Sequence, residues 1–314
     1  MGNTNTTLEQ LRAIVHDEPS PEGWFQLCRA LENLEGEALQ VGLNYVRASV
    51  SQWPDSIRSY QGPFEEVANT PWAALLGHTC LYFREVEPDR RASAAPFLGQ
   101  PVHGRLNQIS ARVEALANWP HLGGVTSLDL SREAIGPGGA EALARSPYLQ
   151  LRSLDLANNT VGGAGARALA SAAGLGCLER LVLRFNGIGD EGAAALAHSP
   201  HLGRLIVLDL GFNDIGVEGL TALTHSLKLA PQWLSLKCNR IDDYALRLWL
   251  RGPARHALRV VDLDNNAITD EGAKLLVHSG MVHQLHTLNL RRNALSPAGA
   301  ALLQEAATHT TLHL

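Results

Sequence analysis

The sequence predicts an α/β solenoid, with short parallel strands on its inner face and helices on its outer face, preceded by a small α-helical domain. Three observations support this prediction: an eleven-residue string occurs seven times, it recurs at a nearly constant interval, and Gly- and Ala-rich stretches follow it. The string reads apolar-x-x-apolar-x-Leu-x-x-Asn-x-apolar, and its ninth positions are 26 or 27 residues apart. Each string opens one repeat, and we call the repeats units one to seven. The strings span residues 125–135, 151–161, 178–188, 205–215, 231–241, 258–268 and 285–295.

Each string is expected to form a short strand followed by a bend. In unit two, Leu151, Leu154 and Leu156 are separated by polar residues and would form the inward face of the strand. The Asn at position nine then turns inward, where its amide can satisfy backbone groups at the bend. Six units carry it, at Asn159, Asn186, Asn213, Asn239, Asn266 and Asn293. Unit one has Glu133 instead, as an atypical terminal repeat can.

The stretches after the bends predict outer helices. Residues 162–169 and 189–196 consist mainly of Gly, Ala and Leu, and small residues let neighbouring helices lie close together. No unit can bury its apolar face alone, so stability is expected to come from stacking of successive units. Residues 312–314 are expected to add a last edge strand.

The repeats resemble those of the ribonuclease-inhibitor-like class of leucine-rich-repeat proteins. The residues that carry the resemblance are the Leu-Asp-Leu strands at 128–130, 154–156 and 208–210 and the helix starts at 189–193 and 270–273. The similarity covers about residues 106–314, and a helical segment ahead of the repeats is similar to that of bacterial proteins of this kind. The resemblance implies a non-enzymatic protein–protein interaction module, with a regulator of a small GTPase as the alternative.

The chain is predicted to hold two domains. Residues 1–95 form an α-helical N-terminal domain, and residues 96–314 form the repeat domain, with an N-terminal cap at 96–124, seven repeats over 125–311 and a partial last strand at 312–314. The polar stretch 84–96 is interpreted as the connection. Residues 1–100 contain 7 Arg, no Lys and 13 Asp and Glu, which gives a net charge of −6. The remaining residues contain 19 Lys and Arg and 18 Asp and Glu, which gives a net charge of +1.

Helix signals are frequent in residues 1–95. Residues 6–9 read as a capping box, and Ser20 followed by Pro21 reads as an N-cap with Pro at the first helical position. A third helix is predicted over 35–52, with further helix at 64–69 and 72–83. No nucleophile with a base at a recognisable spacing is found there, so a hydrolase is not favoured.

Composition limits the function classes. No basic stripe of the kind that binds phosphates is present, which excludes nucleic acid as the expected partner. No apolar run approaches a membrane span and residues 1–10 lack the features of a signal peptide, so a cytoplasmic protein is expected. The four cysteines show no paired spacing, which argues against disulfides and zinc. Cys28 and Cys177 are interpreted as buried small side chains. No cofactor and no metal are expected.

Two sets of polar residues could carry chemistry but have simpler explanations. His198, His225 and His278 fall at the ends of three outer helices, where a cation suits the last carbonyls, and no His spacing gathers three metal ligands. Position five of the strands carries a row of carboxylates, which could act as acid and base or form surface ion pairs with nearby cations. The row consists of Asp129, Asp155, Asp209 and Asp262. We expect ion pairs.

The inner, concave face of units three to five is the candidate binding surface. Positions two, three, five, seven and eight are expected to face outward from the strands or lie at their rim. Because adjacent strands are about 4.8 Å apart, Phe185 and Phe212 should be near neighbours. Aromatic and Arg side chains are frequent interface anchors, although aromatics at position eight could also simply stack and cover the bend. The candidate protein-binding residues are Arg180, Val182, Arg184, Phe185, Val207, Asp209, Phe212, Trp233 and Lys237.

Unit five departs from the pattern near this surface. Pro231 replaces the first strand residue, and residues 242–245 replace the Gly-containing helix start. Tyr244 in place of Gly should push the outer helix away locally. The departure is either drift in one repeat or an irregularity beside a binding site.

Overall fold

The computed structural model describes residues 2–50, 53, 59–61, 79–82 and 112–314. Three helices come first: α1 (Gly2–His16), α2 (Pro21–Glu32) and α3 (Gly36–Ser49). Ser20 caps α2 as predicted, because its Oγ accepts a hydrogen bond from the backbone N–H of Gly23 at 3.1 Å. The predicted capping box at residues 6–9 is wrong, since α1 begins at Gly2 and these residues lie inside the helix. Helix α3 confirms the predicted third helix.

The apolar faces of these helices explain why they pack together. Leu27 and Leu31 of α2, Leu11 of α1 and Val46 of α3 recur at helical spacing and are fully buried. Cys28 is also buried, as predicted, and burial raises the pKa of its thiol far above the usual range. This thiol is therefore a packing residue.

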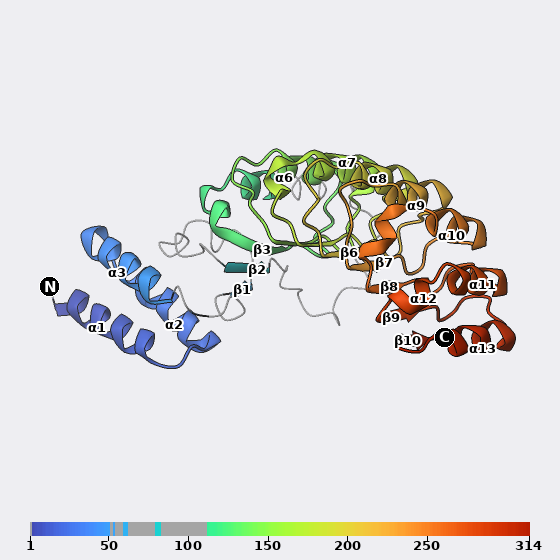
Figure 1. Ribbon diagram of the computed structural model, residues 1–314. Coiled ribbons are helices and arrows are strands. Elements are labelled where there is room, and N and C mark those ends of the chain that lie inside the picture. Colours follow the sequence, from blue (N-terminus) through green and yellow to red (C-terminus); the bar gives the residue numbers. More distant parts are fainter. Residues whose placement is uncertain (1, 51–52, 54–58, 62–78, 83–111) are drawn as a thin grey trace, which may run out of the picture.

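The strands form one parallel sheet in chain order (Figure 1). Its described strands are β1 (Ser59–Gln61), β2 (Thr79–Tyr82), β3 (Val125–Asp129), β4 (Ser153–Asp155), β5 (Arg180–Val182), β6 (Val207–Asp209), β7 (Trp233–Ser235), β8 (Val260–Asp262), β9 (Thr287–Asn289) and β10 (Thr311–His313). Every neighbouring pair is parallel. The predicted solenoid and its last edge strand are confirmed.

The first two strands correct the prediction for the N-terminal region. Residues 79–82 were expected in a helix but form β2, which pairs with β3 through a register shift between Thr79 and Cys80. Neither β1 nor β2 carries the repeated string, so the sequence pattern gave no sign of them. The predicted helix at 64–69, the remaining residues of the predicted helix at 72–83 and the connection at 84–96 lie outside the described residues. The domain limits at 95 and 96 stay a prediction.

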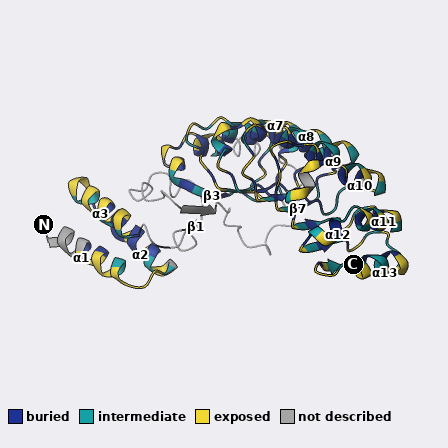
Figure 2. Ribbon diagram, in the orientation of Figure 1, coloured by how far each residue is buried: buried dark blue, intermediate teal, exposed yellow. Residues whose placement is uncertain are grey.

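Helices cover the outer side of the sheet, and the strands line the inner, concave side (Figure 1). The outer helices are α6 (Pro137–Ala144), α7 (Gly162–Ser171), α8 (Gly189–Ala197), α9 (Val217–Thr224), α10 (Asp243–Trp249), α11 (Asp270–His278) and α13 (Pro297–Ala306). Short turns join helices to strands at η3 (Pro120–Gly124), η4 (Ala173–Leu175), η5 (Pro253–Ala257) and α12 (Met281–Gln284). The repeated leucines are buried, and Figure 2 marks buried residues on both the helices and the strands of the solenoid.

The position-nine asparagines lock successive units together. Asn213 is 1% exposed, and its Oδ1 accepts hydrogen bonds from the backbone N–H groups of Asn186 (3.0 Å) and Ile188 (3.3 Å). Its Nδ2 donates to the carbonyl oxygens of Leu183 (2.8 Å) and Gly211 (3.1 Å). Three of these four groups belong to the preceding unit. The same links are made by Asn159, Asn186, Asn239, Asn266 and Asn293. The predicted inward-facing Asn row is confirmed.

Position eight, just before each Asn, has a left-handed backbone in every unit. None of these residues is Gly, although a left-handed conformation costs roughly 1–2 kcal/mol for most side chains. They are Arg132, Asn158, Phe185, Phe212, Cys238, Asn265 and Arg292, with φ between 53° and 66°. The N–H of Phe185 donates to the carbonyl of Gly211 at 3.0 Å, and that of Phe212 to the carbonyl of Lys237 at 2.8 Å. The bend is therefore imposed by bonds to the next unit.

Carboxylates at the starts of three outer helices, α8, α10 and α11, bind the start of the following outer helix. Asp190 Oδ1 accepts from the N–H groups of Gly216 (2.7 Å) and Gly219 (2.9 Å) at the start of α9. Asp243 and Asp270 hold Thr269 and Ser296 in the same way. A Cβ on Gly219 would lie 2.6 Å from Asp190 Oδ1, so this glycine is required by a close approach.

The prediction for Tyr244 is wrong. In unit four Gly219 stands six residues after the unit's Asn, and in unit five the residue at that distance is Ala245, not Tyr244. Ala245 is fully buried, whereas Tyr244 is 60% exposed at the preceding position, which points to solvent. Tyr244 therefore does not displace the helix.

Histidines close three of the outer helices, as predicted. Nδ1 of His198, His225 and His278 lies 2.7, 2.9 and 2.7 Å from the carbonyl oxygen four residues earlier. A second row was not predicted: Ser199 and Ser226 follow two of these histidines, and their hydroxyls donate to the carbonyls of Ala170 and Ala197 in the preceding unit. Hydrogen bonds thus join the units on the outer side as well.

Replacing the Asn of unit four should destabilise the fold. Asn213→Ala leaves buried backbone groups of two units without partners, and we expect a loss of about 1–3 kcal/mol in the free energy of unfolding. Urea denaturation measures this loss. Glu218→Ala, an exposed change in the same unit, is the control and should stay within about 0.5 kcal/mol of the wild type. Similar losses for both variants would show that the Asn amide does not hold the units together.

Adding a methyl group at the close approach should also destabilise. Gly219→Ala forces Asp190 away from the N-terminus of α9, and we expect a cost of about 1–3 kcal/mol from overpacking. The matched control is Gly138→Ala in α6, where a Cβ meets nothing within 4 Å. That change should be neutral or stabilise by about 0.5 kcal/mol, since Ala loses less backbone entropy on folding. Thermal melting curves that place Gly219→Ala at or above the wild type would contradict the close-approach explanation.

Candidate protein-binding surface

The middle of the concave face is built from residues held in register. Arg180, Val207, Trp233 and Val260 stand at position three of successive strands and are direct neighbours across the sheet. Adjacent strands are about 4.8 Å apart, so the four side chains form a continuous row. Trp233, Val207 and Val260 are half-buried and Arg180 is exposed. Ile206, at position two, is 43% exposed.

Two phenylalanines stack at the rim where the strands end. The ring centroids of Phe185 and Phe212 are 3.8 Å apart and the rings are inclined by 16°, which confirms that they are near neighbours. Phe185 keeps 44% of its surface exposed, and Phe212 is half-buried. The stack covers the bend, and it also leaves an aromatic surface open to solvent.

A cluster of charged side chains follows the phenylalanine stack along the rim, in units five to seven. The ammonium of Lys237 lies 6.0 Å from the ring centroid of Phe212, within range of a cation–π interaction, and 3.1 Å from the carboxylate of Asp264. Arg292 donates two hydrogen bonds to the same carboxylate, one from Nε at 2.8 Å and one from a terminal guanidinium nitrogen. The hydrogen bonds from Arg292, together with Lys237, hold the pKa of Asp264 below its usual range although the residue is only 3% exposed in its side chain.

The row of position-five aspartates corrects a prediction. In place of ion pairs, Asp129, Asp155, Asp209 and Asp262 each accept a hydrogen bond from the backbone N–H two residues further on, at 2.8 to 3.0 Å. No ion pair to these four carboxylates occurs within the described part of the chain. Burial raises the pKa of Asp155 and of Asp262. The short side chain reaches its own bend more easily than it reaches a cation on the next strand.

The structure brings together most of the predicted binding residues but not all. Arg180, Arg184 and Phe185 are exposed, and the other members of the set are half-buried apart from one. Val182 is 2% exposed, so the expectation that it faces outward from the strand is wrong. Asp264 and Arg292 were missed, because nothing in the repeat string marks a carboxylate at position seven as buried.

Two further features offer no binding site. Cys177 is exposed, which corrects the prediction that it is buried, and Cys238 is half-buried with its sulfur 3.0 Å from Nδ2 of Asn265.

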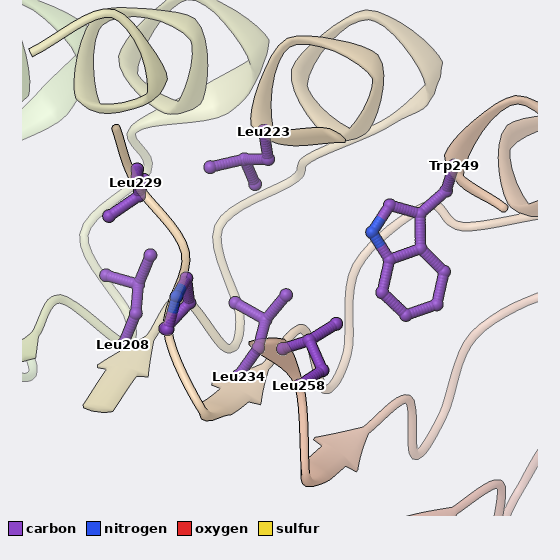
Figure 3. A pocket seen from close by; sticks show the side chains of 7 residues that line it. Leu208, Leu223, Leu229, Leu234, Trp249 and Leu258 are labelled. Atoms are coloured by element: carbon purple, nitrogen blue, oxygen red, sulfur yellow. The ribbon is translucent and has the colours of Figure 1, made fainter. Parts of the chain in front are cut away.

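Between α9, α10 and the sheet lies a cavity of about 10 Å³, lined only by apolar side chains such as Leu223, Leu234 and Trp249 (Figure 3). This volume is about that of one water molecule, so the cavity is a packing defect of unit five.

The repeats match a known family over part of the chain. Residues 151–170, 177–197, 205–223 and 256–277 match a family model described as Leucine Rich repeat. These segments are leucine-rich repeats, and the parallel strands and outer helices around them form a leucine-rich-repeat solenoid. The same comparison matched no enzyme family. No curated protein matches the chain in sequence.

Several solved structures are similar at the level of the fold. A Bacteroides fragilis protein is 14% identical, with a TM-score of 0.46, and covers 90% of this chain and 72% of its own. An internalin from Listeria monocytogenes is 15% identical, with a TM-score of 0.34 and coverage of 94% and 97%. A chain of the yeast Rad7 and Elc1 complex is 12% identical, with a TM-score of 0.40 and coverage of 87% and 77%. Likenesses of this size do not extend to function.

Two exclusions apply to the described residues. No group of three or more His, Cys, Asp or Glu side chains there could hold a metal ion. No helix in that part of the chain is long and apolar enough to cross a bilayer.

Removing the charge of Asp264 and of Asp155 should change stability in opposite directions. The folded-state pKa of Asp264 is lowered, so its ionised form stabilises the fold above the unfolded pKa of about 3.9. Asp264→Asn should cost about 1–3 kcal/mol at neutral pH, since hydrogen bonds to two cations weaken. The pKa of Asp155 is raised, so its ionised form opposes folding, and Asp155→Asn should stabilise while keeping an acceptor for the Ala157 N–H.

The pH dependence separates the two cases. The deficit of Asp264→Asn should shrink as the pH falls through the lowered pKa of Asp264. The gain of Asp155→Asn should vanish as the pH falls through the raised pKa of Asp155, where the wild-type carboxyl becomes neutral. Urea denaturation of both variants between about pH 3 and pH 7 measures these differences. A loss of stability in Asp155→Asn at neutral pH would refute the role given to its burial.

Proposed function

We propose that this protein is a non-enzymatic interaction module that binds a partner protein on the concave face of units three to five. One observation carries the proposal: the Phe185–Phe212 stack is partly open to solvent and stands on backbone fixed by the Asn row. Monomeric proteins rarely expose contiguous large apolar side chains without a function. Val207 and Trp233, which are neighbours at position three, form a second, half-buried apolar area toward the other end of the strands.

The rigidity of the surface supports binding. Phe185 and Phe212 are held in left-handed backbone by hydrogen bonds to the next unit, and their rings support each other by stacking. A partner therefore has little conformational entropy to remove from these side chains on binding. Exposed Arg184, next to Phe185 in the chain, and exposed Arg180, next to Val207 across the sheet, match the composition of interface anchors. A regulator of a small GTPase is one form that such a module takes, and a nucleotide-turnover assay with candidate GTPases tests it.

Truncating the aromatic residues should weaken partner binding. The partner is first captured on the immobilised chain and identified by mass spectrometry, with Phe212→Ala as the comparison bait. Titration calorimetry then measures Phe185→Ala, Phe212→Ala and Trp233→Ala, each of which should lose about 1–4 kcal/mol of binding free energy.

The control for this series is Arg167→Ala. Arg167 is exposed on α7, on the outer side of the solenoid, so this variant should bind as the wild type does. Wild-type affinity in all three aromatic variants would place the interface elsewhere on the molecule.

A further inference from the structure

The rim where the strands end carries an excess of positive charge. This strand-exit rim comprises the position-seven and position-eight residues Arg184, Phe185, Phe212, Lys237, Arg291 and Arg292, together with Asp264. Four cations thus face one carboxylate. Asp264 is shared by Lys237 and Arg292 and is nearly buried, so it cannot neutralise the two arginines at the ends of the rim.

Those two arginines are available to a partner. Arg184 and Arg291 are exposed, and the side chain of neither makes a hydrogen bond or ion pair with the described residues. By contrast Arg152, at the other end of the strands, is paired with Glu179 at 2.7 Å, and Arg240 is paired with Asp214 at 2.6 Å. Arg184 therefore leaves one unpaired cation next to Phe185 in the chain, and Arg291 leaves another at the far end of the rim.

We propose that the partner presents an acidic segment with apolar residues to the strand-exit rim. The proposal rests on the proposed function and adds the chemistry of the partner. The apolar side chains of the segment lie on Phe185 and Phe212, and its carboxylates meet Arg184, Lys237 and Arg291. Carboxylate and guanidinium groups can pair in a bidentate manner, which gives such contacts orientation as well as attraction.

The spacing of the cations suits a helix. Arg184, Lys237 and Arg291 belong to units three, five and seven, so successive cations are two strand steps apart, about 9.6 Å. Residues two turns apart on a helix, i and i+7, are separated by about 10.5 Å. An amphipathic helix lying across the strands can therefore place one acidic residue at each cation, with apolar residues between them.

The neighbouring aspartates favour an acidic helix over a nucleic acid. Asp155, Asp209 and Asp262 form a row two residues away from the rim along the strands, which is about 7 Å. A helix can carry its carboxylates on one side and keep them away from this row. A nucleic-acid strand carries a phosphate on every nucleotide, and the chain as a whole has a net charge of −5.

Matched peptides test the proposal on the full chain. Three fluorescein-labelled helical peptides of about 16 residues share the same Leu and Phe positions, and differ only in carrying Glu, Gln or Lys at every seventh position. Fluorescence anisotropy measures their Kd, and a single-stranded oligonucleotide of similar length is the fourth probe. We expect the Glu peptide to bind about tenfold more tightly than the Gln peptide, with the Lys peptide and the oligonucleotide weaker still, and added salt to reduce the preference.

Charge reversal locates the binding. Arg184→Glu and Arg291→Glu should each weaken the Glu peptide about tenfold and leave the Gln peptide unchanged. The matched control is Arg247→Glu on the outer helix α10, which makes the same change in charge at an exposed site and should have no effect. Urea denaturation of the variants verifies that they fold.

The outcomes separate this proposal from the proposed function. If the Gln or Lys peptide binds best, and Phe212→Ala abolishes that binding, the acidic partner is wrong and the concave binding surface stands. Tighter binding of the oligonucleotide, or charge reversal without effect on the Glu peptide, also overturns the acidic partner. If no peptide binds, or if Phe212→Ala leaves the binding of every peptide unchanged, the rim is not the docking surface.

Discussion

The buried amide of the position-nine Asn is the interaction on which the rest of the structure depends. It gives two hydrogen bonds to carbonyl oxygens and accepts from N–H groups, mostly in the unit before it. The bend after each strand has backbone groups that no regular sheet or helix satisfies, and leaving them buried without partners would be costly. Because one short side chain must reach both units, the strands stay in register and the period hardly varies.

The same constraint shapes the concave face. For the Asn to turn inward, the residue before it adopts a left-handed backbone, and the chain meets this demand without using Gly. A side chain is thereby kept at the strand-exit rim in every unit, and it varies from Phe to Arg to Cys while the Asn beside it is the same in units two to seven. Hydrogen bonds between units hold the scaffold, and the rim residues are left to determine what the surface contacts.

The sequence predicted the features that every unit repeats. The leucines, the Asn row, the parallel strands and the contact between Phe185 and Phe212 all follow from a fixed period and the geometry of a strand. Features that depend on neighbouring rows were not predictable: Val182 is covered by its surroundings, and Asp264 is buried because cations from two other units reach it. Tyr244 was misplaced by one residue because unit five has Ala245, and not a Gly, at the place where the helix start is closely packed. Strands β1 and β2 carry no repeat signal.

The direction of the Asn links has a consequence for how such a chain can change in length. Each unit offers the same carbonyls and N–H groups to the unit after it and receives the same amide in return. Removing or duplicating one whole unit would rejoin the Asn amide with the same backbone groups, whereas an insertion of a few residues in the bend would break the link on both sides. Growth by entire units would lengthen the arc and move the Phe185–Phe212 stack relative to its ends, without disturbing the stack itself.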